Sequence, residues 1–403
     1  MTYFDILKLF RQIHGKRGPD SKWIRERGLL AVKIAHRYAM AAGLLDKKSR
    51  RELGKLYRHC ERLPIGQARQ VISSYVGSGF LNALKSLDDT PLGCGSVAQV
   101  HRAQLADGRH VAIKFVRRAE MREEFQADLA RLRSLLKPML KVSKSAKQIA
   151  FPEAILKDIE TYTLRELDLT QELAGIQTLQ RFKNQHRANF YLAKLQFPKI
   201  EETLSGNFIL VSDYVEGKTF DQLLQEGTLS QDNLVDLLSI QGFFMFMAGA
   251  YHGDLHPGNV ILSGESLFFV DNAYVAECDE KTRLGIFHMI HALARDDHET
   301  CAIQMNKMPQ SELHGDAYRD YKYRFRTEFA EIAKRDKGHL GLGTTLTEAL
   351  RIGAACGMEF PESIHPLLRN LTYLGGMISR FDPGANPVEQ MSQVLEQFTR
   401  HTE

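Results

Sequence analysis

The sequence predicts an α+β protein with two lobes, and three observations support that class. The length of 403 residues exceeds what a single hydrophobic core usually holds. Short β-branched runs separated by turn residues concentrate between about residues 89 and 216, whereas elsewhere apolar residues recur at the helical spacings of three and four. Hydrophobic residues make up 43% and charged residues 25%, which excludes an intrinsically disordered chain. A strand-rich portion followed by a helix-rich portion is the α+β layout.

The leading segment, residues 1–88, is expected to form a helical extension. It is basic, because residues 1–60 hold 15 Lys and Arg against 5 Asp and Glu, a net charge of +10 in a chain of +4. Such a segment fits a solvated helix face, an anionic membrane surface or a nucleic acid. The few aromatic residues in it form no stacking platform, so no nucleic-acid partner is expected.

Residues 89–216 are expected to form a strand-rich lobe that carries a helical insertion. The runs Val97 to Val100 and Val111 to Val116 flank Asp107-Gly108, a strong hairpin signal. Helical stretches are expected at about 119–141 and 153–184, followed by strands at about 197–200 and 208–215.

Residues 217–403 are expected to form a mainly helical lobe. The exceptions are Val260-Ile261-Leu262 and Leu267 to Val270, two apolar runs on either side of Ser263-Gly264-Glu265. That arrangement predicts a short hairpin.

The sequence also predicts a soluble cytoplasmic protein. No stretch reaches the roughly 18 apolar residues that a membrane-spanning helix needs, and the opening residues lack the pattern of a secretory signal. Five cysteines without CxxC spacing are expected to be reduced thiols rather than a zinc cluster or a disulfide framework. Peripheral contact with the inner membrane surface through the basic segment stays open.

The first motif is Gly93-Cys94-Gly95-Ser96, which approximates GxGxxG with Ala98 in the last glycine place. Glycines permit a positive φ and let backbone N–H groups approach a phosphate. Taken alone, the pattern fits an ordinary turn better than a phosphate-binding loop.

The second motif, Val111-Ala112-Ile113-Lys114, puts a lysine inside a β-branched strand. An inward lysine needs a partner, whereas an outward one on a half-exposed strand does not. V-A-I-K after a glycine-rich hairpin is typical of the kinase lysine that contacts ATP phosphates.

The third motif carries the most information. The run from His252 to Asn259 fits H-x-D-x-x-x-x-N, and Asp271 follows the predicted hairpin. Phosphoryl transfer needs one carboxylate at the acceptor hydroxyl, plus an amide and a second carboxylate to hold Mg²⁺, and Asp254, Asn259 and Asp271 supply them in that order. We expect His252 and His256 to be structural, because Pro257 makes a regular helical metal pair improbable.

The lysine needs a carboxylate partner, and the stretch from Thr163 to Phe182 offers three. Treated as one helix, Glu172 falls inside the apolar stripe, whereas Glu166 and Asp168 lie at its edges. An acid among apolar residues needs a cation, so Glu172 is the favoured partner of Lys114.

Together these motifs resemble the UbiB/aarF-domain family of atypical kinases. Val97 to Ala103 is similar to the family's signature strand, Glu166 to Glu172 to its E-x-D element, and His252 to Asn259 to its catalytic loop. The step from Lys114 to Glu166 matches the family's helical insertion. The resemblance implies a bilobal protein-kinase-like fold that uses ATP and Mg²⁺. It also implies a slow ATPase or kinase that supports isoprenoid-quinone or lipid metabolism, acting on an unidentified small-molecule or lipid acceptor.

On this reading each motif residue receives a role. Lys114, held by Glu172, contacts the α- and β-phosphates, and Asp254 orients the acceptor hydroxyl or a water. Asn259 and Asp271 hold Mg²⁺. The remaining residues expected at the nucleotide are Gly93, Cys94, Gly95, Ser96, Glu166, Asp213 and Val215.

Two departures from the family pattern leave alternatives open. The family's K-x-G-Q motif, whose helix covers the active site in that family, is here Lys33-Ile34-Ala35-His36. Asp-Phe-Gly is here Asp271-Asn272-Ala273. A small-molecule kinase acting on a soluble metabolite and a nucleotide-binding scaffold with weak catalysis are the two alternatives.

Overall fold

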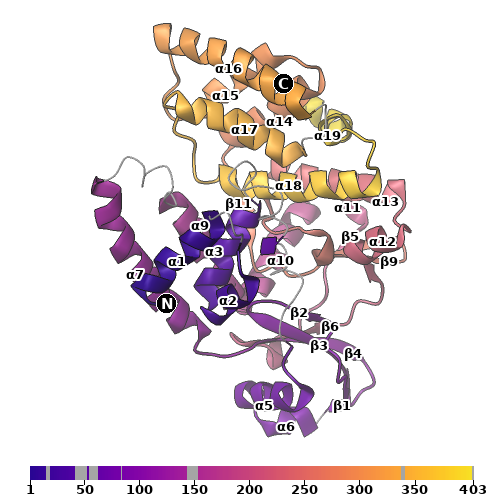
Figure 1. The fold of residues 1–403 in the computed structure, drawn as a ribbon. Helices are drawn as coiled ribbons and strands as arrows, with labels where there is room; N and C mark the ends of the chain where they lie inside the picture. Colours follow the sequence, from indigo (N-terminus) through magenta and orange to yellow (C-terminus); the bar gives the residue numbers. More distant parts are fainter. Residues whose placement is uncertain are drawn as a thin grey trace. The chain divides into compact units, whose positions relative to one another are not determined.

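The computed structural model describes residues 1–14, 19–40, 52–53, 62–82, 84–142, 153–336 and 341–401. The chain divides into two compact units (Figure 1). The first unit comprises Met1–Leu173 and Pro198–Tyr214, and the second comprises Ala174–Phe197 and Val215–Glu403. The expected division into three parts at residues 88 and 216 stays a prediction, and each unit is described by itself.

The first unit contains an antiparallel five-stranded sheet. Its order is β1 (Leu84–Leu87), β3 (Ala98–Leu105), β4 (His110–Val116) and β6 (Ile209–Asp213), and β2 (Gly93–Cys94) also pairs with β3. The expected hairpin at Asp107-Gly108 is confirmed, since Gly108 has a φ of 90° and joins β3 to β4.

One face of this sheet is covered by α5 (Ile65–Val76), and α6 (Ser78–Asn82) leads into β1. Val111, Ile113 and Phe115 of β4 are fully buried in the cluster that α5 completes. Because side chains alternate along a strand, Lys114 points to the opposite face of the sheet.

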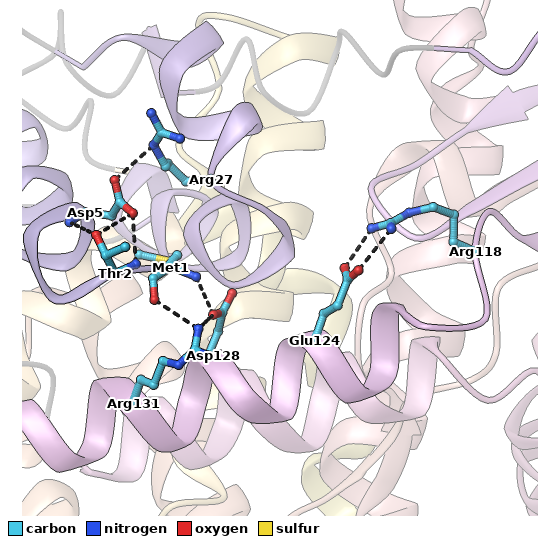
Figure 2. Close-up of polar contacts among 8 residues, drawn as sticks. All are labelled: Met1, Thr2, Asp5, Arg27, Arg118, Glu124, Asp128 and Arg131. Carbon is cyan, nitrogen blue, oxygen red and sulfur yellow. Dashed lines mark hydrogen bonds and ion pairs between the residues drawn. The ribbon is translucent and has the colours of Figure 1, made fainter.

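A second apolar cluster of the first unit joins the leading helices to the insertion. The helices α1 (Tyr3–His14), α2 (Ser21–Glu26) and α3 (Leu29–Met40) pack with α7 (Met121–Val142) and α9 (Glu153–Glu166). Figure 2 shows polar contacts at this junction, where the amino group of Met1 lies against Asp128 and its carbonyl accepts from Arg131. The leading helices therefore share a core with the insertion.

The single helix expected over 153–184 is wrong. The structure has two helices, α9 and α10 (Thr170–Gln185). Between them Asp168 accepts hydrogen bonds from the backbone and hydroxyl of Thr170, and Leu169 donates to the carbonyl of Asn207. An aspartate that binds a backbone N–H two residues ahead favours a new helix start over continuation of the old helix.

The strand expected at 197–200 is also displaced. The structure has β5 at Leu195–Gln196, followed by an isolated bridge at Ile200, and η1 (Glu202–Leu204) precedes β6. Pro198 has no N–H to donate to a ladder, which accounts for the interruption.

The second unit is mainly helical, as the sequence predicts. It contains a four-stranded sheet with the strand order β5, β10 (Ser266–Phe269), β9 (Val260–Ser263) and β7 (Lys218–Thr219). A separate two-stranded sheet pairs β11 (Val275–Glu277) with β8 (Ala250–His252). The remaining elements are α11 (Phe190–Ala193), α12 (Phe220–Glu226), α13 (Gln231–Gly242), η2 (Phe243–Ala248), η3 (Pro257–Asn259), α14 (Glu280–Ala294), α15 (His298–Lys307), α16 (Gly315–Asp336), α17 (Leu342–Ala355), α18 (Ile364–Phe381), α19 (Pro387–Leu395) and η4 (Glu396–His401).

The core of the second unit positions the loop that follows β8. Helix α13 continues into the π-helical turn η2, which ends at Gly249 with a φ of 75°. Phe244 and Phe246 of η2 are fully buried, and Phe246 contacts Phe287 of α14. The chain then enters β8, so the third motif begins on a strand anchored by the aromatic core.

Candidate functional site

In the first unit, Lys114 and Glu172 form an ion pair. Lys114 lies in the middle of β4, opposite Val100 of β3 and Leu210 of β6. Its Nζ contacts Oε1 of Glu172, and the two side chains are 17% and 4% exposed. A carboxylate this deeply buried is stable as an ion only when a cation accompanies it. The pair therefore fixes the lysine head group at one position.

Glu172 reaches this position because a new helix starts just before it. It lies in the first turn of α10, where the helix dipole favours a negative charge. Leu169, Ile176 and Leu179 around it are buried, as the apolar stripe requires.

Glu166 lies elsewhere, because α9 ends at that residue. Its carboxylate contacts Nζ of Lys33, the lysine of the motif that departs from K-x-G-Q. Lys33 also lies over the ring of Tyr162, 4.9 Å from the centroid. The contact links α3 of the leading helices to α9, and the sequence did not predict this partnership. The expected role of Glu166 at the nucleotide stays a prediction.

The glycine-rich motif forms a tight turn between β2 and β3. The N–H of Gly95 donates to the carbonyl of Ala98 at 2.8 Å. Neither Gly93 nor Gly95 has a φ in the left-handed region, so the turn does not need glycine for its backbone conformation. A Cβ at Gly93 would meet no atom within 4 Å, and one at Gly95 would lie 3.7 Å from the carbonyl oxygen of Ala98, an ordinary contact.

The expectation of five reduced cysteines is wrong at Cys94, which is disulfide-bonded. Cys278, Cys301 and Cys356 are free, as expected. The spacing of the cysteines could not reveal the bond, because a pairing across the chain depends on the fold.

Asp213 is the last residue of β6 and pairs with Val111 of β4, while Val215 follows two residues later in the second unit. Their expected roles at the nucleotide stay predictions.

In the second unit, the loop after β8 is held by its two histidines. His252 is fully buried; its Nε2 donates to the carbonyl of Val270 at 3.0 Å, and its Nδ1 accepts from the N–H of Asp254 at 3.2 Å. Burial lowers the pKa of His252, which favours the neutral ring that this pattern requires. His256 accepts from the N–H of Gly258 at 3.1 Å. Both histidines hold backbone, as expected, and among the described residues no group of three His, Cys, Asp or Glu could hold a metal ion.

Hydrogen bonds of Asn259 join the segments that carry the two predicted magnesium ligands, Asn259 and Asp271. Asn259 donates from its side chain to the carbonyl of Asp254 at 3.1 Å, and its own carbonyl accepts from the N–H of Val270 at 3.0 Å. Asp271 follows with a φ of 58°. Carboxylate and amide oxygens are the hard ligands that Mg²⁺ prefers, so the donor set fits that ion.

Helix α18 contributes contacts that the sequence did not reveal. Arg369 donates to the carbonyl of Gly253, and Tyr373 donates to the carboxylate of Asp254 at 2.8 Å. One signal in the sequence could have indicated these contacts. Arg369-Asn370 interrupts an otherwise apolar helical pattern, and polar residues that are buried need hydrogen-bond partners.

The turn after Asp271 packs closely against α10. A Cβ on Gly175 would lie 1.8 Å from the carbonyl oxygen of Asn272. We expect Gly175→Ala to lower the free energy of unfolding by about 1–3 kcal/mol, because backbone must move to admit the methyl group. Denaturant unfolding measures this, with Gly376→Ala on α18 as control. At Gly376 a Cβ meets nothing within 4 Å, so alanine should stabilise by roughly 0.5 kcal/mol. Equal effects of the two variants would contradict the packing described here.

These features define a class. A glycine-rich turn, a strand lysine paired with a helix glutamate and an H-x-D-x-x-x-x-N loop followed by an aspartate are the parts of a kinase-like fold. The chain belongs to the ABC1 atypical kinase-like domain family, whose model matches residues 55–305, more than half of the chain.

The chain is also similar in sequence to several known proteins. The chain is 24% identical to an uncharacterized protein in the hydrogenase 1 5′ region of Clostridium pasteurianum, covering 93% of this chain and 70% of that protein. It is 24% identical to AarF domain-containing protein kinase 1 of Xenopus laevis, over 70% of this chain and 54% of the relative. It is 28% identical to the probable protein kinase UbiB of Vibrio cholerae, over 49% of this chain and 36% of that relative. The chain thus spans about half the length of the AarF-domain relative and about a third of the UbiB relative.

The solved structure of the Rv3197–erythromycin complex from Mycobacterium tuberculosis has a TM-score of 0.54 and 18% identity to this chain. The match covers 97% of this chain and 94% of that one. At this identity the likeness establishes the fold.

No helix in the described part of the chain is both long enough and apolar enough to cross a membrane.

Proposed function

We propose that this protein binds ATP with Mg²⁺ and uses it for phosphoryl transfer or ATP hydrolysis. The observation that carries the proposal is the buried ion pair of Lys114 and Glu172, on the sheet that also carries the glycine-rich turn. A lysine held in this way presents a fixed positive charge to phosphates. Bound Mg²⁺ neutralises phosphate charge, and Asn259 and Asp271 would hold it. Asp254 orients the attacking hydroxyl or water.

The resemblance to UbiB/aarF proteins supports a role in isoprenoid-quinone or lipid metabolism, with a small molecule or lipid as acceptor. A small-molecule kinase acting on a soluble metabolite is the alternative within the same chemistry, and rapid phosphorylation of an added alcohol would identify it.

A nucleotide-binding scaffold is the second candidate, and two observations favour it. Lys33, on helix α3 of the leading segment, forms an ion pair with Glu166. In addition, Asn272-Ala273 stands where ordinary kinases have Phe-Gly. The scaffold would bind Mg·ATP without useful turnover.

The testing experiment is thermal unfolding with and without Mg·ATP, joined to an ATP-turnover assay. At about 100 times its dissociation constant a ligand stabilises the fold by roughly 2.7 kcal/mol. A magnesium-dependent rise in Tm with turnover supports the enzyme, and a rise without turnover supports the scaffold. Absence of a magnesium-dependent rise in the full chain would refute nucleotide binding.

We also propose that the basic leading segment contacts anionic membrane surfaces. On α1, Phe4 is 73% exposed and Leu7 is 50% exposed, and the exposed Arg11 follows at the next helical spacing. Apolar side chains beside cationic ones suit an anionic lipid surface, where each Lys or Arg contributes about 1 kcal/mol.

The double variant Phe4→Ser/Leu7→Ser is expected to weaken binding to anionic vesicles at least about tenfold, because two apolar side chains no longer enter the interface. Vesicle sedimentation at low and high salt measures this, and salt should weaken wild-type binding. Tyr323→Ser, 65% exposed on α16, is the matched control. Unchanged binding of the double variant, or no binding by the wild type, would exclude this role for α1.

A further inference from the structure

Helix α18 directs three polar side chains at the loop that carries Asp254. Tyr373 lies three positions after Asn370 and four after Arg369, so the three side chains share one face of the helix. Arg369 and Asn370 are buried, and Tyr373 is half-buried. Buried polar side chains are costly unless they form hydrogen bonds, and each of these three has a partner that belongs to the loop or contacts it.

Two of these side chains hold the backbone of the loop. Arg369 donates to the carbonyl of Gly253 from Nε at 3.3 Å and from Nη2 at 3.1 Å, and it lies 5.2 Å from the ring centroid of Tyr274. Asn370 accepts from the side-chain amide of Gln241 at 2.9 Å, and that same amide donates to the carbonyl of His252 at 3.0 Å. The peptide units just before Asp254 are therefore fixed.

The third side chain holds the carboxylate itself. The hydroxyl of Tyr373 donates to Oδ1 of Asp254 at 2.8 Å. The Tyr373 ring lies edge-on to His256, with 5.9 Å between the centroids. A tyrosine hydroxyl can donate to a carboxylate, and an ionised carboxylate can only accept, so the direction of this bond is settled by chemistry. Donation to one oxygen restricts rotation of the carboxylate about its last side-chain bond, which is otherwise soft.

We propose that Tyr373 is a positioning residue for phosphoryl transfer, acting through Asp254. Its hydroxyl sets the direction in which the Asp254 carboxylate meets the acceptor hydroxyl or water, and so the fraction of time in which that group is aligned for attack. The inference rests on the proposed function, because it assigns Tyr373 a role in the same reaction. It adds a helix remote in sequence to the parts that determine turnover.

Tyr373→Phe tests the inference, because it removes the hydroxyl and keeps the ring. We expect kcat for ATP turnover to fall about tenfold, equivalent to about 1.4 kcal/mol. KM for ATP and the magnesium-dependent rise in Tm should stay unchanged, since Tyr373 acts on the acceptor side. Tyr323→Phe, on the exposed face of α16, is the matched control and should leave kcat unchanged.

The same substitution in an Asp254→Ala background separates positioning from general support. If Tyr373 acts through the carboxylate, Tyr373→Phe has no further effect on the residual turnover of Asp254→Ala. Equal fold losses in the two backgrounds, or a loss of kcat accompanied by a matching loss of thermal stability, would overturn the inference. Full turnover of Tyr373→Phe alongside lost turnover of Asp254→Ala would overturn it while leaving the proposed function intact. Absence of turnover in the wild type, or full turnover in Asp254→Ala, would overturn the proposed enzyme and the inference together.

Discussion

Asp254→Asn and Asp271→Asn are expected to lower ATP turnover by at least about a hundredfold each, but with different effects on binding. In the proposed function Asp254 acts on the acceptor, so its loss should leave the Mg·ATP-induced rise in Tm intact. Asp271 is expected to hold the metal, so its loss should remove the magnesium dependence of that rise as well. Losing one preorganised electrostatic contact to a transition state typically costs that much rate or more.

The measurements are steady-state turnover and thermal unfolding at several magnesium concentrations. Asn272→Ala serves as control for perturbing the turn beside Asp271, since its side chain donates to the carbonyl of Phe269. Should Asp254→Asn retain full function in a biological assay while Asp271→Asn fails, the scaffold would replace the enzyme as the preferred function.

Lys114→Met is expected to lower the free energy of unfolding by about 3 kcal/mol and to remove the Mg·ATP-induced rise in Tm. The side chain of Glu172 is 4% exposed, and removing Lys114 takes away a cation that stabilises this buried charge. The double variant Lys114→Met/Glu172→Leu should regain most of the stability, because it removes both charges. It should not regain the response to nucleotide, because the proposed function places Lys114 at the phosphates.

Denaturant unfolding and thermal shift measure the two effects separately. The pair of Lys218 and Glu226 is the matched control, because the two side chains are 55% and 43% exposed. Lys218→Met should therefore cost no more than about 1 kcal/mol. A normal Mg·ATP shift in the double variant would show that Lys114 does not contact the phosphates.

Local signals predicted much of the fold. The Asp107-Gly108 hairpin and the pairing of residues 260–263 with 266–269 follow from turn chemistry and alternation, which depend on neighbouring residues only. The partnership of Lys114 with Glu172 also followed from the sequence, because an acid inside an apolar stripe has few ways to be satisfied.

The features that the sequence did not predict depend on contacts between distant segments. The break at Asp168 went unrecognised because the apolar stripe continues across it, although a capping aspartate was present. The contact of Lys33 with Glu166 and the support of Asp254 by Tyr373 both join residues far apart in sequence. Periodicity carries no information on such pairs.

The left-handed backbone conformation at Asp271 limits which residues are tolerated at this position. With a φ of 58°, the position is one that asparagine, aspartate and glycine tolerate, whereas β-branched residues are strained in it. In a saturation mutagenesis screen for folded protein, Asp271 should therefore accept asparagine and glycine and reject valine and isoleucine. A screen for nucleotide turnover should accept aspartate alone. The difference between the two tolerance profiles would separate what this position contributes to the shape of the chain from what it contributes to chemistry.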